Sequence, residues 1–224
     1  MYRKLDFTSN QQLTSIHYWS NRFFVFSALH YPYSFLRIII MKKVKLLVLS
    51  TACLLPSLSF ANNITLNQTI PPVSVKQYGE IFYTDNAFQY SNWNTEQLKG
   101  KVRVLQVIAG RSNAKAMNAD LMSAITLEKF PESKYQTTTI INQDDSIWGT
   151  GGFVKSSAEE SKKDFSWSSM VLDENGAVAK AWDLKEESSA IIVQDKQGNV
   201  IFVKEGKLSE DEIGQVISLI QAQI

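Results

Sequence analysis

The residue types best suited to nucleophilic and metal chemistry lie only near the start of the chain. Cys53 is the single cysteine and the two histidines are His17 and His30, so residues 62–224 contain neither type. That segment therefore cannot form disulfides, thiol nucleophiles, zinc sites of the Cys/His type or histidine general bases. Chemistry there must rest on carboxylates, amines and hydroxyls.

The first candidate site is Gly110–Lys115 (GRSNAK), which follows an apolar run and opens a helical pattern. The N–H groups at a helix start, with Arg111 and Lys115 beside them, can bind a small anionic ligand such as a carboxylate, phosphate or sulfate. The alternative is structural, with Ser112 or Asn113 as the helix cap. Arg111 would then pair with a carboxylate, and Lys115 would be solvated. The sequence favours the capping interpretation and leaves anion binding open.

The second candidate site combines Asp144, Asp145 and Trp148 in a glycine-rich stretch. Paired carboxylates can act as acid and base, so a hydrolase or transferase using Asp144 or Asp145 is an alternative function. Calcium loops alternate their oxygen ligands, whereas adjacent aspartates point in different directions, so we expect no metal here. An exposed Trp148 would indicate a binding groove, and packing under the loop is the other interpretation. No residue is assigned a catalytic role.

Residues 41–61 have the three parts of a secretory signal peptide. Met41–Lys43 is positively charged, Val44–Leu55 is apolar, and Ser59–Ala61 supplies small residues for cleavage after Ala61. The apolar run is about twelve residues long, whereas a membrane-spanning helix needs about twenty. We therefore expect export to the periplasm with no membrane anchor after cleavage.

Residues 1–40 precede a complete signal peptide, which is normally found at the N-terminus of a precursor. One interpretation is that translation starts at Met41 and that residues 1–40 are an over-extended reading frame. The other is an unusually long region before the apolar run. In both cases the exported protein consists of residues 62–224.

The exported segment is acidic. Seven of the 23 basic residues and one of the 22 acidic residues precede Asn62, which leaves 16 basic and 21 acidic residues and a formal charge of −5. An acidic surface repels phosphate backbones, so nucleic-acid binding is not expected. The expected partner is a periplasmic protein or a small anionic ligand, and no cofactor is expected.

Hydrophobic periodicity predicts one α/β domain over residues 62–224. Val102–Ala109 is a nearly continuous apolar run, which is typical of a strand covered on both faces. A helix with apolar residues from Ala114 to Ile125 ends before Pro131, and Tyr135–Asn142 is the next strand. Together these elements form a β-α-β unit that should be right-handed.

Later segments complete a mixed sheet flanked by helices. The expected elements are a strand at Met170–Asp173, a short helix through Lys180–Trp182, a hairpin of Ala190–Gln194 and Val200–Lys204, and a final helix capped by Ser209 and Glu212. Val73–Val75 and Ile81–Tyr83 are predicted as edge strands. Residues 143–167 are predicted to be irregular, with a short helix at 156–163. Trp182 falls in a helical apolar pattern and is predicted to be core.

Several blocks of the sequence resemble known families. Gln97–Val102 (QLKGKV) and Ile191–Gly198 (IIVQDKQG) are similar to exported thioredoxin-like proteins of the TlpA type. Four longer blocks resemble a narrower group, the YtfJ family of exported bacterial proteins: AGRSNAK at 109–115, YQTTTIIN at 135–142, DDSIWGT at 144–150 and LKEESSAI at 184–191. The resemblance covers roughly residues 65–224 and implies a periplasmic thioredoxin-like fold with no established activity.

The resemblance also locates the place of the thioredoxin redox site, which needs a Cys-x-x-Cys at a helix start and usually a facing cis-proline. The matching stretches are Gly110–Lys115, without cysteine, and Glu187–Ala190, without proline. This implies a redox-inactive domain and not a thiol-disulfide oxidoreductase. A non-catalytic binding or partner-interaction module is the expected function. Its candidate groove comprises residues 110–115, 143–152 and 186–190, with Ser188 and Ser189 among them.

The predicted signal peptide leads to a direct prediction about where the chain is cleaved on export. We expect N-terminal sequencing of the exported protein to begin at Asn62, because the small residues that signal peptidase needs end at Ala61. Replacing Met41 with a residue that cannot start translation should abolish production if residues 1–40 are not translated. Unchanged export after that replacement would favour the long leader, and an exported mass that includes Cys53 would contradict the cleavage site.

Overall fold

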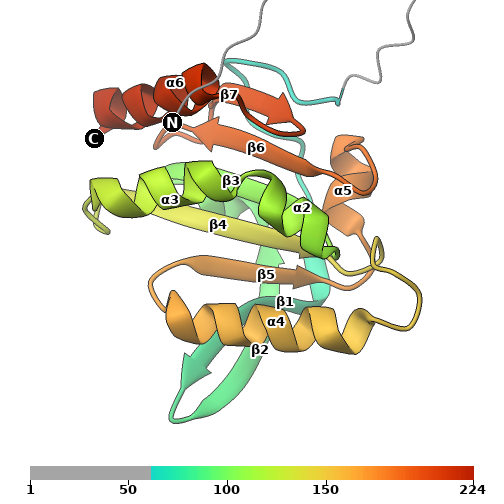
Figure 1. The fold of residues 1–224 in the computed structure, drawn as a ribbon. Coiled ribbons are helices and arrows are strands. Elements are labelled where there is room, and N and C mark those ends of the chain that lie inside the picture. Colours follow the sequence, from blue (N-terminus) through green and yellow to red (C-terminus); the bar gives the residue numbers. More distant parts are fainter. Residues whose placement is uncertain (1–61) are drawn as a thin grey trace, which may run out of the picture. The chain divides into compact units, whose positions relative to one another are not determined.

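The computed structural model describes residues 62–224, so the predicted signal peptide and residues 1–40 lie outside the described residues. One seven-stranded sheet runs through this part of the chain in the order β2-β1-β5-β4-β3-β6-β7 (Figure 1). The strands are β1 (Ser74–Thr84), β2 (Ala87–Asn94), β3 (Val102–Ala109), β4 (Tyr135–Asn142), β5 (Ser169–Asp173), β6 (Ser189–Gln194) and β7 (Val200–Glu205). The helices are η2 (Thr95–Leu98), α2 (Ser112–Met117), α3 (Ala119–Glu128), α4 (Gly151–Asp164), α5 (Ala177–Trp182) and α6 (Glu210–Gln223).

The sheet is mixed, as the sequence predicts. β3, β4 and β5 run parallel at its centre, while β6, β7, β1 and β2 are antiparallel to their neighbours. All eight residues of β3 are buried, which explains its continuous apolar run. The parallel strands β3, β4 and β5 all finish at the same end of the sheet, and β6 starts at that end because it is antiparallel to β3. The loops at this end of the sheet hold the candidate site.

Helices cover one face of the sheet, and the N-terminal segment and α5 cover the other. In Figure 1, α3, α4 and α6 lie in front of the sheet. On that side α3 and α6 pack on Val102 and Val104 of β3. On the opposite side Trp182 of α5 and Trp93 of β2 pack with Leu105 and other apolar residues. The prediction that Trp182 is core is confirmed.

The N-terminal hairpin corrects the sequence prediction. Val73–Val75 and Ile81–Tyr83 were expected as short edge strands, but one strand, β1, contains most of both and lies inside the sheet between β2 and β5. A bulge falls between Val75 and Glu80, where a Cβ on Gly79 would clash with the carbonyl oxygen of Ser91. Only glycine allows that approach.

Residues 143–167 also differ from expectation, because α4 spans 14 residues from Gly151 instead of a short stretch near Ser156. Glycines usually mark loops, yet Gly151 and Gly152 form its first turn. The helix has little apolar periodicity, and only Ala158 and Lys162 are buried. It is held to the hairpin through its polar side chains.

Two lysines of α4 make these contacts. The Lys155 ammonium lies over the rings of Tyr78 and Tyr90, and the Lys163 ammonium lies over those of Tyr83 and Phe88, all 5.1–5.7 Å from the ring centroids. The Tyr90 hydroxyl donates to Glu159 at 2.5 Å, and Lys155 pairs with the same carboxylate at 3.0 Å. Burial and the bond to Glu159 raise the pKa of Tyr90 to about 12. Cation–π and charge-assisted contacts thus replace an apolar stripe on α4.

The expected single helix after β3 is divided into α2 and α3 at Asn118, whose side chain is buried. Its amide nitrogen donates to Ser189 Oγ and to the Gly206 carbonyl, both at 3.0 Å, and its oxygen accepts from the Leu208 N–H at 2.9 Å. One side chain therefore joins the helix break to β6 and to the connection between β7 and α6.

We expect Asn118→Ala to lower the free energy of unfolding by about 3 kcal/mol, because it leaves several buried polar groups without partners. Urea denaturation measures this. Ser123→Ala on the exposed side of α3 is the matched control and should cost less than about 0.5 kcal/mol. Equal effects of the two substitutions would contradict the role given to Asn118.

Candidate functional site

The turn after β3 does not have the predicted cap. Arg111 occupies the N-cap position of α2 in an extended conformation, and its side chain makes no capping hydrogen bond. The expectation that Ser112 or Asn113 occupies this position is therefore wrong, although Asn113 Oδ1, within the first turn, accepts from the Ala114 N–H at 3.0 Å. The turn is placed instead by Gly110, whose N–H donates to the Asn142 carbonyl at 2.8 Å. A Cβ at that position would lie 2.9 Å from the same oxygen.

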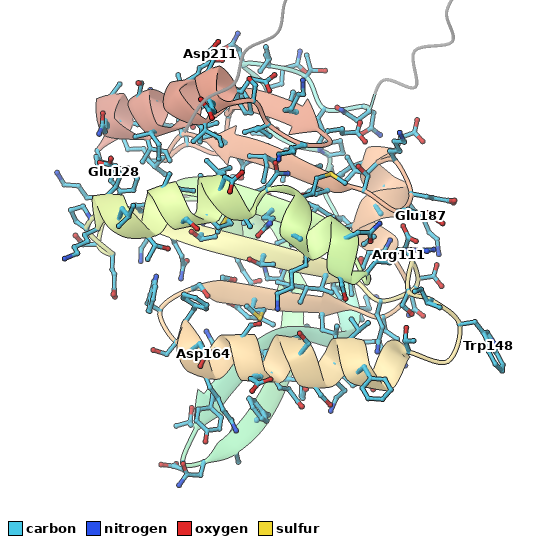
Figure 2. All side chains as sticks on the ribbon, viewed as in Figure 1. Arg111, Glu128, Trp148, Asp164, Glu187 and Asp211 are labelled. Atoms are coloured by element: carbon cyan, nitrogen blue, oxygen red, sulfur yellow. The ribbon has the colours of Figure 1, made fainter. Side chains whose placement is uncertain are left out.

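Arg111 reaches across the edge of the sheet to two acidic residues, as Figure 2 shows for Glu187. Its Nε donates to Asp145 Oδ1 at 3.1 Å, and its Nη2 lies 3.0 Å from Glu187 Oε1. The second Asp145 oxygen accepts from the Glu187 N–H at 2.6 Å. The loop after β3, the loop after β4 and the loop before β6 are thus joined by one bridge, Arg111–Asp145–Glu187.

This bridge changes what the turn can bind. Two carboxylates already balance the guanidinium of Arg111, so an anion would have to displace one of them. The crevice behind the bridge, lined by Asn142, Asp145 and Ser188 among others, holds about 10 Å³, the room of a single water. The pairing of Arg111 with a carboxylate matches the structural alternative from the sequence.

Asp144 and Asp145 point in different directions, as predicted for adjacent residues. Asp144 pairs with Lys180 of α5 at 2.7 Å, while Asp145 faces Arg111. Within the described residues no group of three acidic side chains is placed to hold a metal ion. Each carboxylate is therefore engaged by its own cation, and the two are not directed at a common point.

The remaining predicted groove residues are only partly brought together. Lys115 donates to Ser157 and Ser161 of α4, at 3.3 and 3.2 Å. The Ser188 carbonyl accepts from the Ala109 N–H at 3.0 Å, which fixes the turn before β6. Ser189 is buried and accepts from the Asn118 side chain, and it lines the same small crevice as Asp145 and Ser188.

Trp148 projects away from the body of the domain (Figure 2) and is 98% exposed. Ile147 and Phe153, within five residues of Trp148 along the chain, are 60% and 79% exposed. We call these three residues the Trp148 ridge. The sequence analysis singled out Trp148 but not Ile147 or Phe153. Three large apolar residues within one short polar stretch could have indicated an exposed apolar surface.

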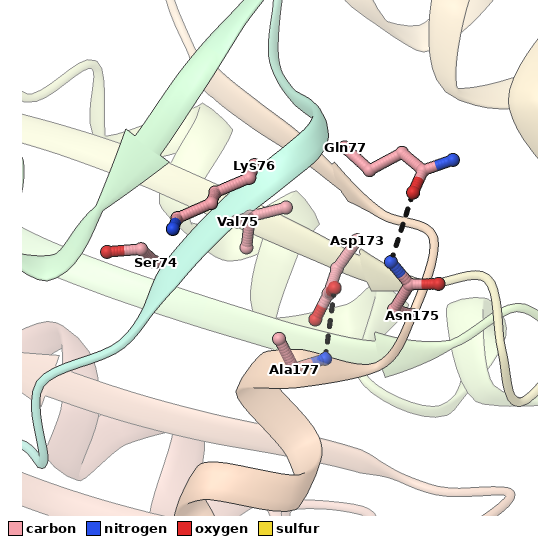
Figure 3. Close-up of a pocket in the computed structure, with 7 residues that line it drawn as sticks. All are labelled: Ser74, Val75, Lys76, Gln77, Asp173, Asn175 and Ala177. Atoms are coloured by element: carbon pink, nitrogen blue, oxygen red, sulfur yellow. Dashed lines mark hydrogen bonds between the residues drawn. The ribbon is translucent and has the colours of Figure 1, made fainter.

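A cavity larger than this crevice lies elsewhere, between the first residues of β1 and the turn after β5 (Figure 3). It is an open hollow of about 440 Å³, which no pattern in the sequence predicted. Its Asp173 carboxylate accepts from the N–H groups of Ala177 and Val178, and Asn175 donates to Gln77 at 3.3 Å. The polar groups that line it therefore form hydrogen bonds mainly with each other and with the first N–H groups of α5.

Comparison with known proteins identifies the family. The family model described as "Bacterial protein of unknown function (YtfJ_HI0045)" matches residues 64–223. The chain belongs to the YtfJ family. It is 48% identical over 171 residues to the uncharacterized protein YtfJ of Escherichia coli strain K12, which covers 76% of this chain and 93% of the relative. It is 46% identical over 180 residues to an uncharacterized protein of Haemophilus influenzae, covering 80% and 97%.

Solved structures show that this YtfJ-family chain has a thioredoxin-like fold. The C-terminal domain of a protein assigned as a thiol-disulfide oxidoreductase from Bacteroides thetaiotaomicron matches with a TM-score of 0.50 and 14% identity, over 71% of this chain and 98% of that domain. At this identity the match concerns the fold alone. Among residues 62–224, no helix is both long and apolar enough to cross a membrane.

The bridge gives a prediction with an internal control. We expect Asp145→Ala to lower the free energy of unfolding by about 2 kcal/mol, because it removes charge-assisted bonds to Arg111 and to the Glu187 backbone. Asp144→Ala breaks only an exposed pair and should cost less than about 0.5 kcal/mol. Urea denaturation distinguishes them, and a larger loss for Asp144→Ala would contradict the bridge.

Proposed function

We propose that residues 62–224 act, after export to the periplasm, as a protein-binding module that performs no thiol redox chemistry. The partner contacts the Trp148 ridge and the Arg111–Asp145–Glu187 bridge beside it. The observation that carries this proposal is the almost complete exposure of Trp148. Tryptophan is normally buried to a large extent, and exposed clusters of large apolar side chains mark interaction sites.

The ridge is supported by a loop that is fixed in place, which favours binding. The Thr150 hydroxyl and N–H both donate to the Ile147 carbonyl, at 2.6 and 2.9 Å. Gln143 donates to the Gly151 carbonyl at 2.6 Å. Because these bonds order the loop before any partner arrives, less conformational entropy is lost on binding. Aromatic anchors with a charged neighbour are typical of the residues that dominate binding energy.

The lack of redox chemistry is supported by residue types. Residues 62–224 contain no cysteine, and the turn where thioredoxin-like enzymes carry their thiols is Gly110–Lys115. Arg111 occupies the N-cap of α2 and is paired with Asp145. A paired guanidinium cannot act as a nucleophile towards a disulfide. Periplasmic location rests on the signal peptide pattern of residues 41–61.

A photo-crosslinking amino acid tests the surface directly. Placed at position 148 of the exported protein in its own periplasm, p-benzoylphenylalanine should give one discrete adduct with a partner. The same amino acid at position 167 is the matched control, because Trp167 is a half-exposed tryptophan beyond the other end of α4. Phe153→Ala should weaken the adduct from position 148 about tenfold, since hot-spot side chains cluster.

Two outcomes would contradict the proposal. Adducts of equal strength from positions 148 and 167 would show that the ridge has no special role. Reduction of insulin disulfides by purified protein beginning at Asn62 would contradict the absence of redox chemistry, whatever the crosslinking result.

A further inference from the structure

The two edge strands of the sheet, β7 and β2, differ in how well they are protected from pairing with another chain. At the β7 edge the N-terminal segment covers the start of the strand, because Asn67 donates to the Val200 carbonyl and Val200 donates to that of Gln68. A further bridge joins Thr69 to Asn199. The end of β7 carries Lys204 and Glu205, and charges on an edge strand discourage pairing with another chain.

The β2 edge lacks both kinds of protection. Among the described residues, β2 pairs with β1 alone. Its eight residues, AFQYSNWN, include no charged residue and no proline. Charges, prolines and covering segments are the usual means by which an exposed edge is kept from binding another strand.

Hairpin geometry defines which groups this edge presents. Asp85 and Asn86 both have positive φ, as a two-residue type I′ turn requires, so Thr84 and Ala87 form the first hydrogen-bonded pair. Hydrogen-bonded pairs then alternate along the regular part of the ladder, from Thr84 opposite Ala87 to Glu80 opposite Ser91. Phe88 and Tyr90 lie between these pairs and direct their N–H and C=O groups outward, and Asn92 follows opposite the bulge in β1.

We propose that a second copy of this chain pairs with β2 in an antiparallel arrangement about a two-fold axis at Tyr90, joining two seven-stranded sheets into one. Tyr90 then faces Tyr90 of the second copy, and Phe88 faces Asn92. Each facing pair makes two backbone hydrogen bonds, as in any antiparallel ladder. Because β2 is uncharged, the strand meets itself without like charges in register.

Side-chain chemistry also favours self-pairing. Phe88 packs against Tyr83 with tilted rings whose centroids are 4.9 Å apart, and Tyr90 packs against Tyr78 in the same way at 5.3 Å, so aromatic pairs already cross from β1 to β2. A two-fold pair keeps Phe88 and Tyr90 of both copies on the same face of the joined sheet. The aromatic rows therefore continue across the junction, where cross-strand aromatic pairs are favourable.

The covered β7 edge explains why the assembly stops at two. Pairing of β2 with β7 of another copy would be head-to-tail and would propagate into an open fibre. The bonds from Asn67 and Gln68 and the charges of Lys204 and Glu205 oppose that contact. The two-fold contact uses each β2 edge once and leaves no further edge of this kind.

Charge substitution on β2 provides the test. Gln89 and Ser91 are exposed and face one another across the proposed axis, so Gln89→Lys/Ser91→Lys brings like charges together at the junction. We expect sedimentation equilibrium of protein beginning at Asn62 to show a dimer, and this variant to weaken its Kd at least tenfold at low salt. Gln215→Lys/Ser218→Lys on the exposed side of α6 is the matched control and should remain dimeric.

Charge complementation distinguishes a specific junction from a folding defect. Mixing Gln89→Lys/Ser91→Lys with Gln89→Glu/Ser91→Glu should restore association as a heterodimer, which an unfolded variant could not do. Three results would overturn the proposal: a wild-type protein that is monomeric at all concentrations, a dimer unaffected by Gln89→Lys/Ser91→Lys, and β2 pairing only with an unrelated extended peptide. Trp148→Ala should leave the dimer intact, because Trp148 is not part of the β2 junction. Dimerisation through β2 and partner binding at the Trp148 ridge are therefore tested separately.

Discussion

The carboxylate of Asp145 is the constraint on which the candidate site depends. Its two oxygens accept from Arg111 after β3 and from the backbone of Glu187 before β6, while its own N–H donates to the Asn142 side chain at the end of β4. Glu187 has a left-handed φ of 56°, a conformation that costs free energy in a residue other than glycine. The bond from Asp145 offsets part of that cost. An ionic bridge therefore holds together the loops that follow β3 and β4 and the loop that precedes β6.

The residues that hold these loops in place differ from the residues whose side chains are exposed for contact with a partner. The bridge uses the charge of Arg111 within the domain and leaves a crevice of about 10 Å³ behind it, so small-molecule binding has little room there. The large apolar side chains of the same loop face outward instead. Their exposure contributes nothing to folding, since burial is what makes apolar surface stabilising. A surface of this kind gains free energy only when another macromolecule covers it.

The elements that could be predicted from sequence are those whose own pattern determines them. β3 and β4 have the predicted bounds because their apolar and β-branched runs are long, and the Ser209–Glu212 capping box is present because both of its bonds lie within one turn. The break at Asn118, the bridge at Asp145 and the length of α4 depend on partners far away in the chain, and no local pattern encodes these. β2 was missed because alternating polar and aromatic residues in an edge strand resemble a loop when their partner strand is unknown.

α4 connects the two surfaces that matter for the proposals. Its first turn carries Phe153 of the Trp148 ridge, while Lys155 and Lys163 further along lie over the aromatic rings of the β1–β2 hairpin. Few apolar side chains hold this helix down, so cation–π contacts and the Tyr90–Glu159 bond set its position. Such contacts are directional, whereas apolar packing tolerates sliding. The hairpin and the ridge are therefore placed by the same few polar contacts, and the helix keeps the outward edge of β2 and the exposed tryptophan in fixed positions without covering either.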